Sequence, residues 1–564
     1  MRSLLRSLPL AALVAAVACN DTAPDAADTT GTGEATPGGT LVIASPAEPD
    51  MLIPGLTQSI GGRMATDMMF DRLAEIGDGL NWIGDEGFTP RLARRWSWAP
   101  DSLSIAFELD PRARWHDGTP VRASDVKFTF ALHKDPAVAS PIAALIANID
   151  SVSVRDSLTA VVWFAKRGPE QFYEAVYQAP IMPEHVYGKD RAGIRGSAVA
   201  RNPVGSGRFR FVRWDAGTRV ELVSDTANYR GRALLDRVVW TLTPDPTAAL
   251  ARLTAGEADF IENVPADQAE RVDAMVTLRV FPYDNLQYSF MAMNLRARKG
   301  GAAPHPVFGD VRVRRAMSMA VDRNAMLGNV FGRYGRRSYG PFPRGLAVAD
   351  TTLPLPAFDT TAAAALLDSA GWLRGPDGVR RKGGRPLAFS ILVPQASKPR
   401  MTYAVLLQEQ FKRMGANVEL ETADFPTFLA KMGGRDFDAT LQAFSIDPSP
   451  SGARQQFGSE AAIVGGSNPF MYANPTFDAH LDSALSSYQP ARAKAHMRNA
   501  YQQLIADAPA IWLYDVLALA GAHERIRMAS MRADEYWAHI ADWYIPEDER
   551  LPRDRVGPGT AAAR

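Results

Sequence analysis

Residues 94–136 read RRWSWAPDSLSIAFELDPRARWHDGTPVRASDVKFTFALHKDP. Apolar and polar residues alternate over positions 105–109, a pattern that predicts a half-buried strand. The dipeptide Asp117-Gly118 that follows is typical of a tight turn. Residues 123–131 fit one face of a helix, although two phenylalanines at alternate positions would also suit a strand. The residues alone therefore indicate a strand, a turn and an element of undecided type.

His116 in this stretch could in principle bind a metal ion or act in catalysis, but the neighbouring sequence favours neither role. A metal site needs three or four converging ligands, and no second ligand lies near His116 in the sequence. The chain holds one cysteine and shows no cluster of histidines. We therefore interpret His116 and His185 as structural and predict no metal, no cofactor and no catalytic residue.

The same stretch resembles the signature of the extracellular solute-binding proteins of family 5, the peptide- and nickel-binding receptors of ABC importers. In that family the segment is architectural. Arg122 stands where the family usually has a threonine that could cap the next helix, so we expect Ser124 to cap it instead. The matching residues are Ala93, Ser97, Trp98, Asp101, Phe107, Leu109, Trp115, His116, Asp117, Gly118, Pro120, Ala123, Asp125 and Val126.

Length and composition are those of a soluble protein with several domains. A chain of 564 residues is too long for a single core. Hydrophobic residues make up 46% and charged residues 22%, which is ordinary for globular domains. Lys plus Arg equals Asp plus Glu at 62 each, so no nucleic-acid-binding surface is indicated.

The first residues predict export. Two arginines precede an apolar run that ends at residue 18, which is the layout of a signal peptide over residues 1–18. The single cysteine, Cys19, follows a small residue as in a bacterial lipoprotein, although ordinary signal-peptidase cleavage also fits. Residues 19–37 lack aromatic side chains and predict a flexible tether. We expect a body held at the periplasmic side of a membrane by lipid on Cys19, or else a soluble periplasmic protein.

Further motifs continue the resemblance in family order. Asn202-Pro203-Val204-Gly205-Ser206-Gly207 resembles a family loop, and its glycines allow close backbone approach to a ligand. Residues 288–294 resemble the strand that crosses between the lobes. We therefore expect ligand contacts from Gly205, Ser206, Tyr288 and Asn294. Other matches lie at residues 310–323, 471–478 and 508–514, and residues 67–76 resemble the family's first helix.

A βαβ unit is predicted from the residues between 387 and 444. Residues 387–393 form a strand, residues 401–414 a helix closed by a glycine, and residues 418–422 a second strand, which implies parallel pairing. Residues 437–444 supply another strand. Ligands gather beyond the carboxyl ends of such strands, and Asp447 lies there.

The resemblance implies a role for Asp447. In the peptide-binding members an aspartate three positions after an aromatic residue takes the ligand's α-ammonium group, and Phe444 is that aromatic residue here. A desolvated ammonium group needs a charged acceptor, so the chemistry suits the position. The alternative is a surface-turn aspartate before a proline.

The predicted fold is α/β: a two-lobed periplasmic-binding-protein fold with a hinge and an extra small α+β domain. We assign residues 38–285 to lobe I, with the extra domain at about 80–195, residues 286–505 to lobe II, and residues 506–564 to the return to lobe I and the tail. Beyond Asp534 no match can be placed.

The expected function is capture of di- or oligopeptides in the inter-lobe cleft by a monomer that delivers them to an ABC permease with its ATPase. A metal chelate, haem or an oligosaccharide remains an alternative ligand, because fold does not settle function. A signalling receptor or a secreted hydrolase remains a rival class. No G-x-S-x-G, H-E-x-x-H or Cys/His nucleophile pair occurs, so we predict a protein that is not an enzyme.

Overall fold

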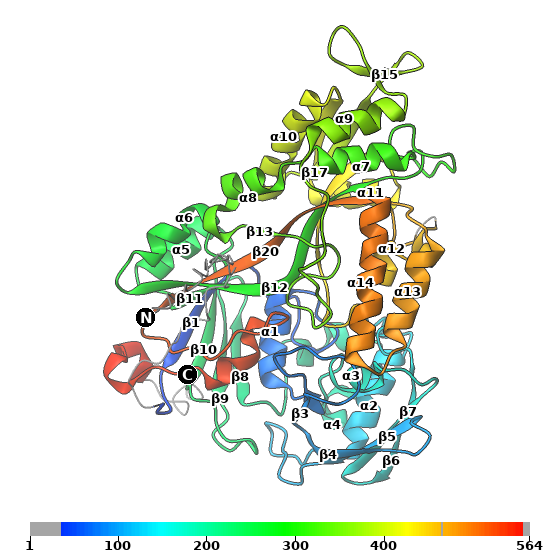
Figure 1. The fold of residues 1–564 in the computed structure, drawn as a ribbon. Coiled ribbons are helices and arrows are strands. Elements are labelled where there is room, and N and C mark those ends of the chain that lie inside the picture. Colours follow the sequence, from blue (N-terminus) through cyan, green and yellow to red (C-terminus); the bar gives the residue numbers. More distant parts are fainter. Residues whose placement is uncertain (1–34, 464–465, 556–564) are drawn as a thin grey trace, which may run out of the picture.

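Two long strands organise the molecule in the computed structural model, which describes residues 35–463 and 466–555. β12 (Leu278–Met293) and β20 (Ala510–His523) pair antiparallel and run from one lobe into the other (Figure 1). They lie inside one mixed sheet with the order β18-β17-β19-β12-β20-β11-β1-β10-β9-β8, and β13 (Arg336–Arg337) pairs beside β20. A single sheet therefore connects both lobes, and the chain crosses between them along it.

The first lobe is built around β1 (Thr40–Ser45). This strand runs parallel to β10 (Arg237–Leu242) on one side and to β11 (Phe260–Ile261) on the other. Its alternate side chains enter a core that holds Trp240 and Trp543, and the outer strands pair antiparallel. The other regular elements of this lobe are β8 (Phe209–Asp215), β9 (Arg219–Ser224), α1 (Ile60–Met69), α5 (Pro246–Thr254) and α6 (Ala266–Asp273).

The second lobe contains the predicted βαβ unit. β17 (Ala388–Pro394), α10 (Lys398–Arg413) and β18 (Asn417–Ala423) follow one another, and the two strands are parallel. β19 (Ala439–Ser445) is parallel to β17 and antiparallel to β12. The prediction of parallel strands is thus confirmed.

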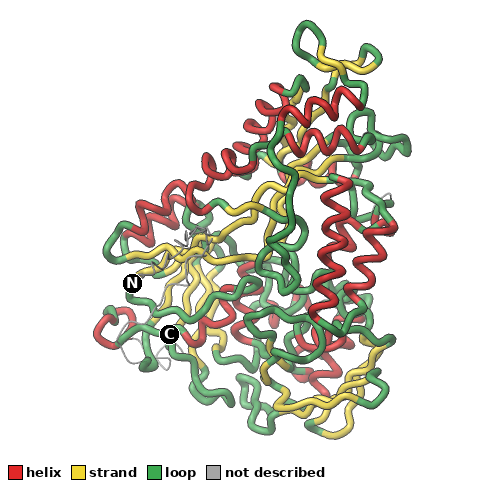
Figure 2. The backbone as a smooth tube through the Cα atoms, in the orientation of Figure 1, coloured by secondary structure: helices red, strands yellow, loops and turns green. Residues whose placement is uncertain are grey.

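Helices cover this part of the sheet, and α13 and α14 pack together as a pair beside it (Figure 2). A small three-stranded sheet of β14 (Leu373–Arg374), β15 (Arg380–Lys382) and β16 (Arg385–Pro386) projects from the far end. The helices of the lobe are α7 (Val311–Met319), α8 (Arg323–Phe331), α9 (Thr360–Ser369), α11 (Phe425–Gly433), α12 (Gly452–Phe457), α13 (Pro475–Leu485) and α14 (Pro490–Asp507).

The small domain is a separate antiparallel sheet with helices on it. Its strand order is β4-β5-β7-β6. The undecided element of the signature stretch is a helix, α2 (Ala123–Lys134). Asp125 accepts a hydrogen bond from the backbone N–H of Arg122 at 2.8 Å, so Arg122 is the N-cap residue and the expected cap at Ser124 is wrong. The other elements are β4 (Ala93–Trp98), β5 (Ser104–Leu109), β6 (Ile149–Asp156), β7 (Thr159–Phe164), α3 (Gln171–Val176), α4 (Glu184–Tyr187), β2 (Ala74–Glu75) and β3 (Thr89–Pro90).

The first helix lies earlier than the sequence suggested. α1 ends at Met69, whereas a helix was expected over residues 67–76. Ser59 starts it, because its hydroxyl accepts a hydrogen bond from the backbone N–H of Gly62 at 3.0 Å. It ends where the backbone becomes extended at the C-cap residue, Phe70, and two residues later Arg72 donates from Nε to the carbonyl of Tyr177 at 2.8 Å.

The tail, for which the sequence offered no match, completes lobe I. Arg532 is 0% exposed and forms ion pairs with Glu75 at 2.7 Å, Asp534 at 2.6 Å and Glu535 at 3.2 Å. A 3₁₀ helix, Tyr536–Asp542, then packs against the lobe I core. No helix in the described ranges is long and apolar enough to cross a membrane.

Candidate ligand-binding site

A cavity of about 850 Å³ lies between the small domain and the second lobe. Its volume is within the range of small-molecule sites, about 300–1,000 Å³. One wall comes from residues 102–178 of the small domain and the other from residues 447–488 of lobe II. Its side chains are mostly polar or charged, including Lys166, Arg167, Glu170, Tyr173, Glu174, Gln178, Asp447, Ser449, Arg454, Asp482 and Tyr488.

Asp447 is placed in this cavity by the end of β19. The strand stops at Ser445, and the chain turns so that Asp447 faces the small domain. In the described part of the chain, β19 pairs with β17 only at Ala439 and Thr440. Its pairing with β12, on the other side, continues to Ser445. Among the described strands, the last part of β19 therefore has one edge without a strand partner.

The environment of Asp447 disfavours an isolated negative charge. Burial raises the pKa of its carboxyl group, and the nearby carboxylate of Glu535 acts in the same direction. The guanidinium of Arg63 and a hydrogen bond from Gln178 partly oppose this rise. Arg63 is 44% exposed and lies 3.5 Å from Glu535, so its charge is already shared with a lobe I carboxylate.

Glu170 of the small domain faces the same cavity from the opposite wall. Burial raises the pKa of its carboxyl group to about 7, and the hydroxyl of Ser449 donates a hydrogen bond to it. Because Ser449 belongs to lobe II, this bond links the two walls. Neither Glu170 nor Asp447 has an ion-pair partner within 4.0 Å among the residues that the structure describes.

The two aromatic residues expected at the site lie behind the cavity, packed at the end of β19. Phe444 is half-buried, and its ring centroid lies 6.2 Å from that of Tyr288 and 5.3 Å from that of Phe290. Tyr288 is buried, and its hydroxyl donates to the side chain of Gln456. Both rings therefore support the end of β19, and they do not themselves line the cavity.

Gly205, Ser206 and Asn294 lie away from the cavity. A Cβ atom on Gly205 would lie 1.9 Å from the carbonyl oxygen of Met69, so this glycine allows a close backbone approach within the protein. Ser206 is fully buried and accepts from the backbone N–H of Asp71 at 3.3 Å. Asn294 is also fully buried and donates from Nδ2 to the carbonyl of Phe437 at 3.1 Å.

The histidines of the two sequence motifs make intramolecular bonds. His116 accepts at Nδ1 from the backbone N–H of Gly205 at 3.2 Å, and its Nε2 lies 2.9 Å from the carbonyl of Gly207. Burial lowers its pKa, which suits this neutral tautomer. His185 Nε2 lies 2.6 Å from Asp117. Within the described ranges, no three His, Cys, Asp or Glu residues converge in a way that could hold a metal ion.

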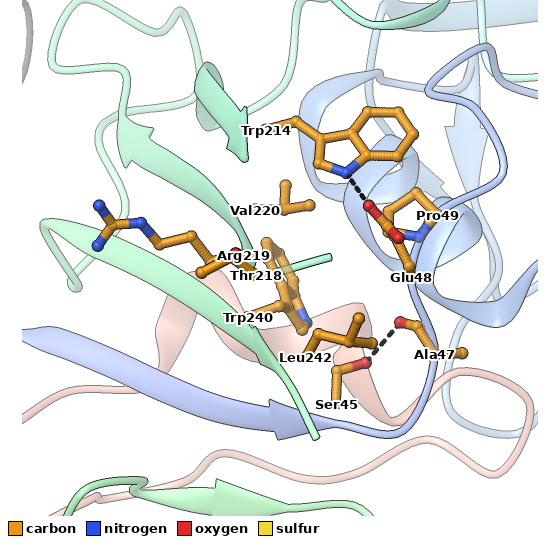
Figure 3. A pocket seen from close by; sticks show the side chains of 10 residues that line it. All are labelled: Ser45, Ala47, Glu48, Pro49, Trp214, Thr218, Arg219, Val220, Trp240 and Leu242. Carbon is orange, nitrogen blue, oxygen red and sulfur yellow. Dashed lines mark hydrogen bonds between the residues drawn. The ribbon is translucent and has the colours of Figure 1, made fainter. Parts of the chain in front are cut away.

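A second hollow, shown in Figure 3, lies on the first lobe. There the indole N–H of Trp214 donates to Glu48 at 2.7 Å, and the hydroxyl of Ser45 donates to the carbonyl of Ala47 at 3.0 Å. The volume is about 10 Å³, which is room for about one water molecule. This hollow is too small to be the solute site.

Sequence reasoning singled out Asp447, which lines the cavity, but not the residues around it. Arg63, Glu170, Tyr173 and Gln178 carry no local signal, because each lies on a helix or turn that looks ordinary in the sequence. Only the packing of the small domain against lobe II brings Glu170, Tyr173 and Gln178 into one cavity with Asp447, and Arg63 of lobe I acts on Asp447 from outside the cavity lining.

Comparison with known proteins gives the same architecture. The oligopeptide-binding protein AppA of Bacillus subtilis is 24% identical over 86% of this chain and 87% of the relative. A putative ABC transporter peptide-binding protein of Brucella abortus is 27% identical over 85% of this chain and 88% of the relative.

Among solved structures, AppA of Bacillus subtilis in complex with a nonapeptide has a TM-score of 0.74 at 23% identity, covering 90% of this chain and 99% of that one. NikZ of Campylobacter jejuni in complex with Ni(L-His) has a TM-score of 0.74 at 21% identity, covering 90% and 100%. The family model described as bacterial extracellular solute-binding proteins, family 5, middle, matches residues 87–464. The chain therefore belongs to the bacterial extracellular solute-binding proteins of family 5.

Proposed function

We propose that this protein is the solute-binding component of an ABC importer and that its solute is a peptide. The observation that carries the proposal is the position of Asp447, a cavity-lining carboxylate beyond the end of β19 with no ion-pair partner within 4.0 Å among the described residues. The peptide's α-ammonium group would supply that missing partner. The names of relatives from Brucella and Bacillus, which are peptide-binding proteins, support the same solute class.

The edge of β19 suits an extended peptide. After Thr440, the residues of β19 pair with β12 on one side. On the side of β17 they pair with no strand of the described sheet. An extended peptide can add to such an edge through backbone hydrogen bonds, which depend little on side-chain identity. Water in the polar cavity would then hydrate the side chains of the peptide. Closure of the lobes about β12 and β20 would enclose it.

The test compares peptides that differ only in the charge of the N-terminus. Isothermal titration calorimetry should show that a free tripeptide binds and that its N-acetylated form binds about thirtyfold more weakly, because loss of a buried charge pair costs about 2 kcal/mol or more. Asp447→Asn should weaken the binding of the free tripeptide by a similar factor. The control Asp548→Asn, at an exposed position, should leave this binding unchanged. Equal binding of the two peptides would refute the role of Asp447.

The identity of the solute is tested by mass spectrometry of small molecules released from the purified protein. Peptides of defined length and mixed sequence would support the proposal, and their recovery without cleavage would support a binding role over a hydrolytic one. The solved relative NikZ is described in complex with Ni(L-His), so a metal complex is the outcome that would replace the peptide.

The proposal includes attachment to a membrane through lipid on Cys19 after removal of residues 1–18, on the periplasmic side. Cys19 lies outside the described residues, and its support is the sequence pattern alone. The protein would act as a monomer that docks on a permease with its ATPase. Cys19→Ser should move the protein from the membrane fraction to the soluble periplasmic fraction. If wild-type protein is already soluble, ordinary signal-peptide cleavage replaces lipidation.

A further inference from the structure

The walls of the cavity hold carboxyl groups that no neighbouring cation among the described residues pairs with. Three carboxyl groups line it without an ion pair within 4.0 Å in the described part of the chain: Asp447 from lobe II, and Glu170 and Glu174 from the small domain. Burial raises the pKa of each of them. A buried carboxylate without a cation costs free energy, so these groups favour a positively charged ligand.

Glu170 and Glu174 are neighbours on one helix. Glu170 immediately precedes α3, and Glu174 lies four positions later, so both point from the same face. Their mutual repulsion adds to the effect of burial on Glu170. Glu174 accepts a hydrogen bond from Asn148 at 3.0 Å, whereas Glu170 accepts from Ser449. These neutral hydroxyl and amide groups satisfy one oxygen each but supply no positive charge.

The basic side chains that line the cavity either form an ion pair with another carboxylate or are exposed to solvent. Arg454 forms an ion pair with Asp482. Lys166 and Arg167 are exposed to solvent, where their charges are screened. The four carboxylates of the lining therefore outnumber its three basic side chains, and the more buried charge is negative.

Tyr173 lines the same cavity as Asp447 and Glu170. Its side chain is buried, and the negative charges of both Asp447 and Glu170 raise its pKa, along with its own burial as the largest cause. Ser449, which bonds Glu170, lies two positions after Asp447. Glu170 is thus close to the place where the first residues of a peptide would lie if its α-ammonium group meets Asp447.

We propose that Glu170 makes the cleft selective for peptides that carry a lysine or arginine side chain next to the N-terminus. The first positive charge, on the α-ammonium group, pairs with Asp447, and the second pairs with Glu170, with Glu174 adding to the attraction. This inference rests on the proposed peptide-binding function and names the subset of peptides that the cavity favours.

A purely structural role of Glu170 would have a different signature. Its bond to Ser449 joins the small domain to lobe II, so it could serve only to hold the cleft closed. Removal of such a link would weaken the binding of every peptide by the same factor. Removal of a charge partner, by contrast, would weaken the binding of basic peptides more than the binding of neutral peptides. Glu170→Gln separates the two roles, because the amide oxygen still accepts a hydrogen bond from Ser449.

The experiment uses the full chain and calorimetric titration with a matched set of tripeptides: trialanine, the same peptide with lysine at position one, two or three, and the same set with uncharged norleucine. We expect the peptide with lysine at position one or at position two to bind about tenfold more tightly than its norleucine counterpart, and the peptide with lysine at position three to show no such gain. Glu170→Gln should reduce this ratio to near one, a readout that cancels any effect common to all the peptides. The control Glu419→Gln, on the exposed outer strand β18, should preserve the ratio.

Each outcome has a distinct meaning. Equal binding of lysine and norleucine peptides to the wild-type protein would refute the inference and keep the proposed function. Persistence of the ratio in Glu170→Gln would refute the role of Glu170. Persistence of the ratio together with a uniform loss for all peptides would mean that the charge of Glu170 acts on the bond to Ser449 and on closure of the cleft, not on the side chain of the peptide. If no tripeptide binds and none co-purifies, the proposed function itself fails. Circular dichroism should show that each variant is folded at the temperature of the titration.

Discussion

A buried carboxyl group at the crossing strands should make the protein more stable when it is replaced by its neutral isostere. Asp515 lies on β20 opposite Tyr288, where the pairing of β12 with β20 shifts register. The residue is 8% exposed, and neither carboxyl oxygen has a hydrogen-bond partner within 3.5 Å in the described structure. Its nearest cation, Arg344, is 3.9 Å away. Asp515 is therefore a poorly compensated charge at the hinge.

The size of the effect follows from the pKa of Asp515. Burial raises this pKa from 3.8 to about 7, and nearby Ser338 and Arg344 oppose the rise only in part. Such a change corresponds to about 4 kcal/mol, which is an upper limit because the site can relax. Between these two pH values the folded protein keeps a proton that the unfolded chain has released. The free energy of unfolding therefore falls as pH rises from about 4 to 7.

Asp515→Asn removes this dependence because an amide does not ionise. At pH 8 the variant should unfold at a higher temperature than the wild type. This difference in unfolding temperature should be smaller at pH 5. Circular dichroism melts at both pH values measure the difference, with Asp548→Asn, on an exposed turn, as the control. A variant that is equally or less stable at pH 8, or a gap that does not change with pH, would refute the reasoning.

Three further changes test the packing of lobe I by denaturant unfolding. Arg532→Met leaves buried carboxylates without their cation, so it should cost about 3–5 kcal/mol; a loss below about 1 kcal/mol would show that the tail network is not structural. Gly205→Ala places a methyl group against the Met69 carbonyl and should cost about 1–3 kcal/mol, and an unchanged midpoint would contradict the close approach of these two backbones. Ser59→Ala removes the cap at Gly62 and should cost about 1 kcal/mol, whereas a neutral result would mean that α1 starts elsewhere.

Local patterns in the sequence were sufficient for most of the secondary structure. The strand at residues 105–109 and the βαβ unit appear as expected, although the strand is more buried than the predicted half. These features depend on side-chain periodicity and on hydrogen bonds between near neighbours, so a single segment contains the information. The first helix was misplaced because no glycine or proline marks its end, and the backbone becomes extended at Phe70 without such a local stop signal.

The sequence by itself determined the family, the two-lobed fold and the position of Asp447 at the end of a parallel strand. Only the tertiary structure decided what surrounds that residue: Glu170 across the cavity, Arg63 on α1, and a tail whose Arg532 joins segments more than 450 residues apart. The physical reason is that periodicity and capping act over a few residues. The charge balance of a cleft, in contrast, depends on side chains that meet only when separate lobes pack together.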